Sequence, residues 1–387
     1  MNPLEESIAK VWAGERLTPK EAVRLHKEAE LSLLATLADE IRRRKHPENI
    51  VTYIIDRNLN PTNVCVTDCG FCAFYAKPGD EAKAWLLDRE TIYAKIQETV
   101  DVGGVQILMQ GGHHPELGVE WFENLLGDIK SRWPDLHLHA MSPPEIEHLS
   151  RVSKITTQEV LEKLQLAGMD SMPGGGAEIL VDRVRELIAP RKTKSTEWLK
   201  ITEEAHQLGM KTTATMMFGH VETIEERVEH LSQLRALQDR TGGFTAFIDW
   251  TFQPGGNPLG EKLAAEGWKK STHVEYLRTT AIARIFLDNF NNLQASFVTQ
   301  GSEAAALSLR MGVNDFGSAM LEENVVSAAG CSELVALQDM ETKIREAGFT
   351  PRQRNQRYEI IDVRGLTPHV DQKETTLSTP PVVPFGQ

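Results

Sequence analysis

The sequence predicts an α/β protein built as a (β/α)8 barrel, with a helical extension before the barrel and a further extension after it. Short β-rich segments recur from residue 51, and stretches of helical character separate most of them. Strands that alternate with helices pair in parallel through right-handed crossovers. Eight such strands fit a closed barrel, although a doubly wound open sheet has the same alternation. The eight segments are 51–56, 105–111, 136–141, 169–172, 212–218, 244–252, 293–298 and 313–318.

The first fifty residues predict a helical extension. Thr18, Pro19 and Glu21 supply an N-cap, a proline at the first helical position and the acid of a capping box. Apolar residues within 34–41 then follow at helical spacing. The cationic run 42–45 fits the end of a helix, where positive charge offsets the macrodipole.

The rest of the chain divides at changes in composition. We expect the barrel to occupy 51–320 and a helical capping region to occupy 321–364. Within the barrel, 222–239 and 273–289 have the apolar spacing of amphipathic helices. From 365 to 387 the sequence becomes rich in Thr and Pro, which is typical of a flexible tail.

Composition and charge argue against several classes of protein. The chain has 387 residues, and 42 Lys and Arg against 55 Asp and Glu leave a net charge of −13. Such an acidic chain is a poor candidate for nucleic-acid binding, which needs a surplus of cations. No apolar run approaches the roughly 18 residues of a membrane span, so we expect no membrane insertion. The N-terminus lacks the features of a secretory signal, which predicts a cytoplasmic location. The sequence does not indicate an oligomeric state.

Three cysteines directly after the first predicted strand form the strongest motif. Cys65, Cys69 and Cys72 have the spacing C-x-x-x-C-x-x-C. Thiolates bind soft metals and iron–sulfur clusters. Three protein ligands on a four-iron cubane leave one iron open to a substrate or cofactor. These three residues are therefore the candidate metal ligands and catalytic residues.

Two metal-site alternatives remain open. His113 or His114 could complete a zinc site with the cysteines, in a catalytic or a non-catalytic scaffold. His137 and His139 share one face of a predicted strand, as do zinc ligands in metal-dependent barrel hydrolases. Cys331 lies far from the triad in sequence, and we expect it to be a small buried apolar side chain.

Glycine-rich segments follow the second and fourth predicted strands. Gly111 and Gly112 form an adjacent pair, and the run 174–176 precedes Glu178. Glycine lets the backbone approach a ligand closely. A carboxylate at the start of the following helix would benefit from the helix dipole and could accept hydrogen bonds from ribose hydroxyls.

The triad and the glycine segments together resemble the radical S-adenosylmethionine (SAM) superfamily. The resemblance implies a radical SAM barrel with a [4Fe–4S] cluster, whose three-cysteine site leaves the fourth iron for SAM. It also implies oxidoreductase chemistry that begins with a 5′-deoxyadenosyl radical. The residues that it assigns to SAM are Phe71, Gly111, Gly112 and Glu178.

Longer segments are similar to the dehypoxanthine futalosine cyclases of the futalosine route to menaquinone. The aminofutalosine synthases and the deazaflavin (FO) synthase components are the nearest alternatives, because they share the triad and the segment Pro-Gly-Gly-Gly-Ala-Glu. The segment 250–255 favours the cyclases. The similar segments are 139–149, 171–180, 212–223, 244–255, 314–330 and 351–360.

The resemblance implies that a ribose radical attacks the benzoate ring of dehypoxanthine futalosine. The partners would be this small-molecule substrate and a reductant such as flavodoxin or ferredoxin. Substrate binding needs donors for a benzoate carboxylate and acceptors for sugar hydroxyls. The candidate substrate-binding residues are Ser142, Glu145, His220, Asp249, Gln253 and Ser296.

Overall fold

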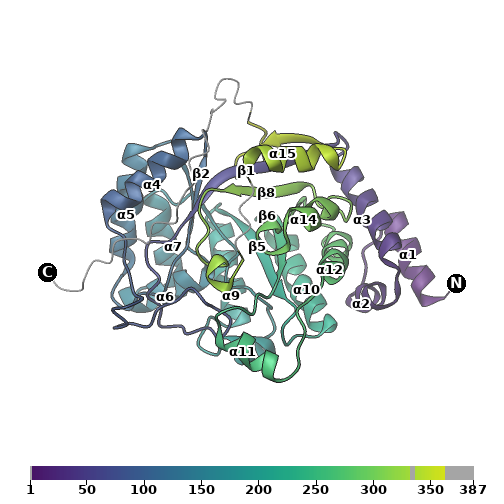
Figure 1. Cartoon of the computed structure of the whole chain (residues 1–387), viewed down its shortest axis with the longest axis horizontal. Coiled ribbons are helices and arrows are strands. Elements are labelled where there is room, and N and C mark those ends of the chain that lie inside the picture. Colours follow the sequence, from purple (N-terminus) through teal and green to yellow (C-terminus); the bar gives the residue numbers. More distant parts are fainter. Residues whose placement is uncertain (1, 332–335, 362–387) are drawn as a thin grey trace.

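Eight parallel strands form a closed barrel at the centre of the molecule (Figure 1). The computed structural model describes residues 2–331 and 336–361. From β2 to β7, each strand pairs with the next one in the sequence. β1 pairs with both β2 and β8 and so closes the ring. This closure confirms the barrel and excludes the open sheet. The strands are β1 Ile50–Leu59, β2 Gln106–Met109, β3 His137–Ala140, β4 Ser171–Met172, β5 Lys211–Phe218, β6 Phe244–Thr251, β7 Asn292–Gln294 and β8 Asp315–Met320.

Several strands, among them β2, β4 and β7, are shorter than the sequence predicts, and β7 shows the cause. The expected segment 293–298 forms β7 only as far as Gln294, and the helix α13 (Phe297–Gln300) follows almost at once. The Tyr276 hydroxyl accepts a hydrogen bond from the backbone N–H of Ser296 at 3.1 Å, and Ser296 in turn accepts one from Gln300. These bonds turn the chain into a helix at the carboxyl end of the barrel.

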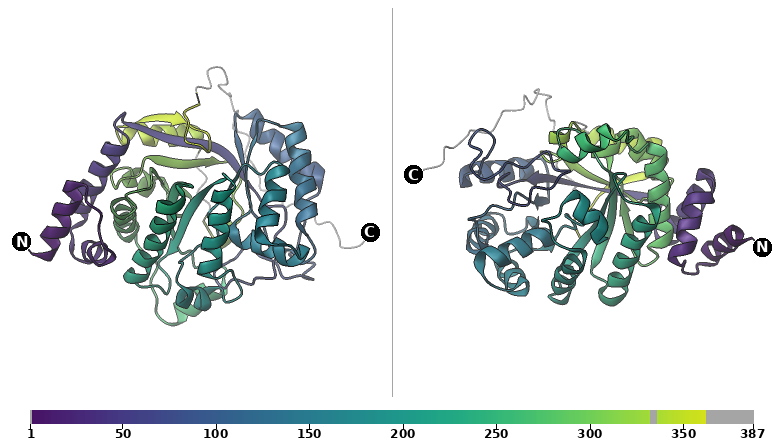
Figure 2. Two further views of the ribbon diagram at one scale, coloured as in Figure 1. Left: turned by 180° about the vertical axis from the view of Figure 1, so that it is seen from behind. Right: turned by 90° about the horizontal axis from the view of Figure 1, so that it is seen from below.

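Helices surround the strands, as two further views show (Figure 2). The predicted amphipathic helices 222–239 and 273–289 correspond to α10 and α12, with apolar faces on the barrel. The helices between or after the strands are α4 Arg89–Asp101, α5 Val119–Arg132, α6 Pro143–Ser153, α7 Thr157–Leu166, α8 Asp182–Ile188, α9 Ser195–Gln207, α10 Ile224–Thr241, α11 Pro258–Ala265, α12 His273–Phe286, α14 Ser302–Ser308 and α15 Leu337–Glu346.

The N-terminal extension is helical, as the sequence predicts. It contains α1 (Pro3–Ala13), α2 (Pro19–Glu28) and α3 (Leu31–Lys45). Thr18 and Glu21 form the expected capping box, in which the Glu21 carboxylate accepts from the Thr18 N–H at 2.7 Å. Helix α3 packs against α12, and α2 packs against α10 and α12, so the extension covers one side of the barrel.

The C-terminal region adds a strand that the sequence analysis does not predict. After α15, β9 (Thr350–Gln353) pairs in parallel with Ile50–Tyr53, the first half of β1. The side chain of Arg354 then lies in the barrel interior, where its Nη2 donates to Asp315 Oδ1 at 2.9 Å. Both side chains are almost completely buried. The segment that we expected to be a helical cap therefore also closes the amino end of the barrel.

The predicted tail 365–387 lies outside the residues that the structure describes. Across 2–331 and 336–361, no helix combines the length and the apolar composition needed to cross a bilayer.

Candidate active site

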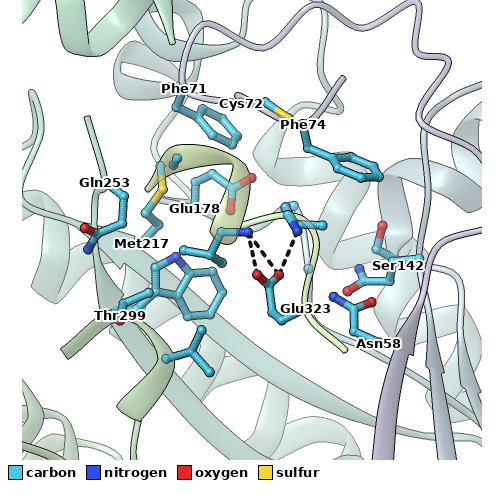
Figure 3. Close-up of a pocket in the computed structure, with 18 of the residues that line it drawn as sticks. Asn58, Phe71, Cys72, Phe74, Ser142, Glu178, Met217, Gln253, Thr299 and Glu323 are labelled. Atoms are coloured by element: carbon cyan, nitrogen blue, oxygen red, sulfur yellow. Dashed lines mark hydrogen bonds between the residues drawn. The ribbon is translucent and has the colours of Figure 1, made fainter. Parts of the chain in front are cut away.

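A cavity of about 390 Å³ opens at the carboxyl ends of the strands (Figure 3). Six different strands contribute to its wall, through Asn58 of β1, Leu108 of β2, Met217 of β5, Trp250 of β6, Gln294 of β7 and Ser318 of β8. Catalytic groups of (β/α)8 barrels lie at this end. The fold therefore brings the loops that follow β1, β2, β4 and β8 around one space.

All three cysteines of the predicted triad line this cavity. Cys69 is buried, and Cys65 and Cys72 are half-buried. Their loop is fixed by backbone hydrogen bonds, among them Cys65 N–H to the Ala76 carbonyl at 2.9 Å and Gly70 N–H to the Ile188 carbonyl at 2.8 Å. The loop thus holds three sulfur atoms at the edge of one cavity.

The chemistry of these three side chains fits the predicted cluster. Burial, with smaller contributions from the neighbouring Cys72 and Cys65, raises the pKa of the Cys69 thiol to about 12, although the charge of Lys192 opposes the shift. Burial also raises the pKa of Cys72. A positively charged centre bound here would offset this cost and favour thiolates. In the described ranges no three His, Cys, Asp or Glu side chains converge on a single metal ion. Cubane ligands bind separate irons, so they need no such convergence.

The glycine pair after β2 lies directly against the cysteine loop. The N–H of Gly112 donates to the Thr62 carbonyl at 2.8 Å, and the N–H of Gly111 donates to Glu145 Oε1 at 2.9 Å. A Cβ added at Gly112 would overlap the backbone carbonyl of Val64. This position therefore requires glycine for close packing of two backbones.

We expect Gly112→Ala to destabilise the apoprotein by about 1–3 kcal/mol, the usual cost of overpacking. The methyl group would push away the backbone at Val64, next to Cys65, and should therefore also lower the iron content after anaerobic reconstitution. Urea unfolding and iron analysis measure the two effects. Gly127→Ala is the matched control, because nothing lies within 4 Å of its added Cβ in α5. Equal stability and iron content in Gly112→Ala and the wild type would contradict this account.

Glu178 is held at the cavity by a cation that sequence analysis did not single out. Lys192 Nζ donates to Glu178 Oε1 at 2.6 Å, and both side chains are largely buried. Burial alone would raise the pKa of Glu178 and lower that of Lys192, but the opposite charges reverse both shifts. The pair is therefore ionised at neutral pH. Lys192 Nζ also lies 5.0 Å from the centre of the Phe71 ring, which joins this pair to the cysteine loop.

Ser142 and Glu145 line the cavity and also begin helix α6. The Glu145 carboxylate accepts from the Ser142 N–H at 2.7 Å and from the Ser142 hydroxyl at 2.6 Å. Burial raises the pKa of Glu145, and the hydrogen bonds from Ser142 and Gly111 oppose that shift. Both side chains thus contribute to local structure as well as to the cavity wall.

Gln253 and Ser296 also line the cavity, on the side of β6 and β7. Gln253 Nε2 donates to the Thr251 carbonyl at 2.9 Å. The hydroxyls of Ser296 and Thr299 are 2.8 Å apart. These contacts leave the side-chain oxygen of Gln253, Oε1, without a hydrogen bond to any other described residue.

The structure places His220 and Asp249 away from the cavity. Side chains alternate along a strand, and in β6 Ile248 and Trp250 line the cavity. Asp249 lies on the other face of β6, where it accepts from the Thr280 hydroxyl of α12 at 3.1 Å. The His220 ring turns back on its own loop, with Nε2 3.0 Å from the Met217 carbonyl and Nδ1 3.1 Å from the Glu222 carboxylate.

Asp249 should make stability depend on pH. Burial raises the pKa of Asp249 to about 7, whereas an unfolded Asp has a pKa near 4. Because the folded state holds the proton more tightly, stability is lost as the pH rises between these values. Asp249→Asn can keep an acceptor for Thr280. Because Asn does not titrate, the variant does not lose stability as the pH rises. The variant should gain roughly 2–3 kcal/mol relative to the wild type between pH 5 and pH 8.

Urea unfolding of the apoprotein at the two pH values measures this gain. Asp135→Asn, at an exposed carboxylate, is the control. A constant difference between Asp249→Asn and the wild type at both pH values would show that Asp249 does not titrate in this range.

Comparisons with known proteins identify the family. The Radical SAM superfamily model matches residues 59–234, and the CofH/MqnC C-terminal region model matches 241–366. A Streptomyces coelicolor cyclic dehypoxanthine futalosine synthase is 47% identical over 93% of this chain and 89% of its own. The chain belongs to the radical SAM superfamily. A second cyclic dehypoxanthine futalosine synthase, from Halalkalibacterium halodurans, is also 47% identical, over 90% of this chain and 92% of its own.

More distant relatives carry other names. An aminodeoxyfutalosine synthase from Thermus thermophilus is 38% identical over 92% of this chain and 95% of its own. The solved structure of methylornithine synthase has a TM-score of 0.68 at 18% identity, and covers 89% of this chain and 97% of that one. The solved structure of the hydrogenase maturase HydG has a TM-score of 0.70 at 14% identity, and covers 90% of this chain and 76% of that one. These two structural likenesses show the fold alone, which is the radical SAM barrel expected from the sequence.

Membership in the radical SAM superfamily implies an enzyme with a [4Fe–4S] cluster and SAM, and favours the radical enzyme over the hydrolase and scaffold alternatives. The histidines that motivated a hydrolase do not line the cavity. His137 and His139 instead contact the same Ser171 hydroxyl, at 2.7 and 2.6 Å. His113 lines the cavity, but its Nδ1 is 2.6 Å from the Thr67 hydroxyl. Cys331 is half-buried, so the expectation that it is fully buried is wrong.

Several residues that line the radical SAM cavity escaped sequence analysis. Lys192 lies in a run of cations from Arg191 to Lys194 that has the composition of an exposed surface. Asn58 follows two charged residues just beyond the predicted segment 51–56, Gln294 is a polar residue within 293–298, and Glu323 is one of two adjacent acids. A polar residue at the carboxyl end of a barrel strand was the available signal for Asn58 and Gln294.

Proposed function

We propose that this chain cyclises dehypoxanthine futalosine to cyclic dehypoxanthine futalosine in the futalosine route to menaquinone. The observation that carries the proposal is the 47% identity to two cyclic dehypoxanthine futalosine synthases across nearly the whole of both chains. The aminodeoxyfutalosine synthase is more distant, at 38% identity. Two 5-amino-6-(D-ribitylamino)uracil–L-tyrosine 4-hydroxyphenyl transferases, from Methanosarcina acetivorans and Methanococcoides burtonii, are 38% and 40% identical to this chain. An aminofutalosine synthase or an FO synthase component is therefore the second candidate.

Cys65, Cys69 and Cys72 would hold three irons of the cluster and leave the fourth for SAM. When bound, the cluster and SAM supply the 5′-deoxyadenosyl radical that removes a hydrogen atom from the ribose. The protein contributes three sulfur donors on a loop that is fixed by its own backbone hydrogen bonds. The shared cavity and the mutual electrostatic influence of the thiols support this assignment.

The proposed SAM contacts are Phe71, Gly111, Gly112 and Glu178, all of which line the cavity next to the cysteines. The Gly111 carbonyl makes no hydrogen bond to another described residue, so it can accept one from an ammonium group. The Glu178 carboxylate stays ionised beside Lys192 and can accept from hydroxyls. Phe71 offers an apolar ring to a flat ligand.

The substrate radical must react with the benzoate ring before it reacts with any other group. The ribose radical adds to the ring and forms the new bond. The ring then passes one electron to a one-electron acceptor such as the oxidised cluster, and one proton to a base, and becomes aromatic again. The protein's part is to hold the two groups close and to keep water out. Apolar side chains suited to this task line the cavity, namely Leu108, Met217, Ile248, Phe252 and Met320.

Four of the six predicted substrate contacts remain in the proposal, because they line the cavity: Ser142, Glu145, Gln253 and Ser296. We no longer include His220 and Asp249, whose side chains bond elsewhere.

The proposal also covers the division of the chain into domains, the reductant and the cellular compartment. We propose an N-terminal helical extension over 1–50, the barrel over 51–320 and a C-terminal region from 321, which the CofH/MqnC match partly spans. A one-electron donor such as flavodoxin or ferredoxin would reduce the cluster. A reducing cytoplasm suits a cluster of this kind.

Anaerobic reconstitution with iron and sulfide, followed by reduction with SAM and dehypoxanthine futalosine, tests the proposal. We expect 5′-deoxyadenosine and a product that lacks two hydrogens relative to the substrate, seen by mass spectrometry. Consumption of an enolpyruvyl benzoate and its attachment to the adenosyl group would instead identify an aminofutalosine synthase. One zinc per chain and no iron after anaerobic purification would contradict any radical SAM function.

A further inference from the structure

Asn58, at the end of β1, has an unused hydrogen-bond donor in the cavity. The residue lines the cavity and only 7% of its surface is exposed. Its Oδ1 accepts from Asn60 Nδ2 at 3.2 Å. Asn60 Oδ1 in turn accepts from Asn324 Nδ2 at 3.2 Å. This relay fixes the orientation of the amides, so Asn58 Nδ2 is left as a donor that no described residue satisfies.

Glu323, in the segment after β8, provides a fixed acceptor in the same cavity. Its Oε1 accepts from the N–H groups of Val325 and Val326 at 2.9 and 3.0 Å. Its Oε2 accepts from those of Val326 and Ser327 at 2.9 and 2.8 Å. Figure 3 draws Glu323 and Asn58 around the same cavity, with the Glu323 carboxylate pointing to the backbone N–H groups from which it accepts. The Val326 N–H is shared between the two oxygens, so three donors face the roughly four lone-pair sites of the carboxylate, and Glu323 can accept one more hydrogen bond from a ligand.

A buried donor and a fixed acceptor that line the same cavity match one chemical group best. The backbone N–H of Asn58 donates to the Glu322 carbonyl at 3.2 Å, which brings the segments of the two residues together. A hydroxyl both accepts and donates, whereas a carboxylate only accepts and would be repelled by Glu323. Asn324 belongs to the same segment as Glu323 and bonds to Asn60, so the two sides of the pair are tied together. The arrangement is therefore preorganised before a ligand arrives.

We propose that Asn58 and Glu323 bind one hydroxyl of the substrate's ribose, with Asn58 Nδ2 donating to the hydroxyl oxygen and Glu323 accepting its hydrogen. This inference rests on the proposed function. It gives the pair a role in positioning the sugar whose radical must face the benzoate ring.

Binding of monodeoxy substrate analogues tests the pair. Dissociation constants are measured by anaerobic calorimetry on the reconstituted enzyme with SAM present and the cluster left oxidised, so that no turnover occurs. We expect the wild type to bind dehypoxanthine futalosine about tenfold or more tightly than one of its ribose monodeoxy analogues, because the missing hydroxyl leaves buried polar groups unpaired. In Asn58→Ala and Glu323→Ala this ratio should fall towards one.

Asn291→Ala is the matched control, because Asn291 is exposed and its side chain bonds to no described residue. It should keep the wild-type ratio. An unchanged ratio in Asn58→Ala, or equal binding of every analogue by the wild type, would overturn the inference. So would an Asn58→Ala variant that loses affinity for SAM and not for the substrate, since the pair would then bind the SAM ribose. Failure of the wild type to bind dehypoxanthine futalosine at all would reject the proposed function together with the inference.

Discussion

Cys69→Ala should abolish 5′-deoxyadenosine formation and reduce bound iron to the background of unreconstituted protein. Cys69 is the only buried member of the triad, and Cys65 and Cys72 lie on either side of it in the same loop. Two remaining thiolates would leave two irons of a cubane without protein ligands, and such a cluster is not retained. The loop itself should survive, because its fixing bonds are made by the backbone.

Iron and sulfide analysis, visible absorption and quantification of 5′-deoxyadenosine measure this loss. Cys331→Ala is the matched control, since Cys331 is the fourth cysteine and does not line the cavity. It should keep wild-type iron and activity. The assignment of the triad would fail if Cys69→Ala kept the cluster and Cys331→Ala lost it.

Arg354→Met should destabilise the apoprotein by about 3–5 kcal/mol, because it leaves Asp315 buried without its cation. Arg354 is held on several sides, since its Nη2 also donates to Gln294 Oε1 at 3.3 Å and its backbone N–H donates to the Tyr53 carbonyl at 2.8 Å. Asp315 further accepts from the Thr52 hydroxyl. Loss of the guanidinium therefore disturbs β1, β7 and β8 together.

Equilibrium unfolding in urea measures the change in the free energy of unfolding. Arg352→Met, two residues earlier on an exposed position of β9, should change it by less than about 0.5 kcal/mol. Replacing both partners, as in Asp315→Asn with Arg354→Met, should recover much of the loss, since no buried charge then remains. A loss in Arg354→Met no greater than that in Arg352→Met would show that the buried pair is unimportant for stability.

Much of the fold could be predicted because its signals are local. The alternation of strands and helices and the capping box at Thr18 depend on residues close together in sequence. β9 has no such signal: it consists of Pro351 and three polar residues, and only its pairing with β1 makes it a strand. The end of β7 depends in the same way on Tyr276, a residue of another element.

The site divides along similar lines. The spacing of the cysteines and of the glycine pair was enough to predict that they line the cavity, because the residues of each motif are neighbours in sequence. Asp249 was assigned to the cavity since it lies on β6, but the face of a strand that looks inward depends on the register of the whole barrel. Lys192 and Glu323 come from loops, and only the closed barrel brings them to the cavity.

The pairing of β9 with β1 also has a consequence for synthesis on the ribosome. β1 is the first barrel strand to leave the exit tunnel. The edge of Ile50–Tyr53 stays exposed until Thr350–Gln353 have been synthesised. An open edge of this kind invites pairing with other nascent chains. A chaperone that holds the chain through this interval should therefore raise the yield of native protein more than one supplied after release.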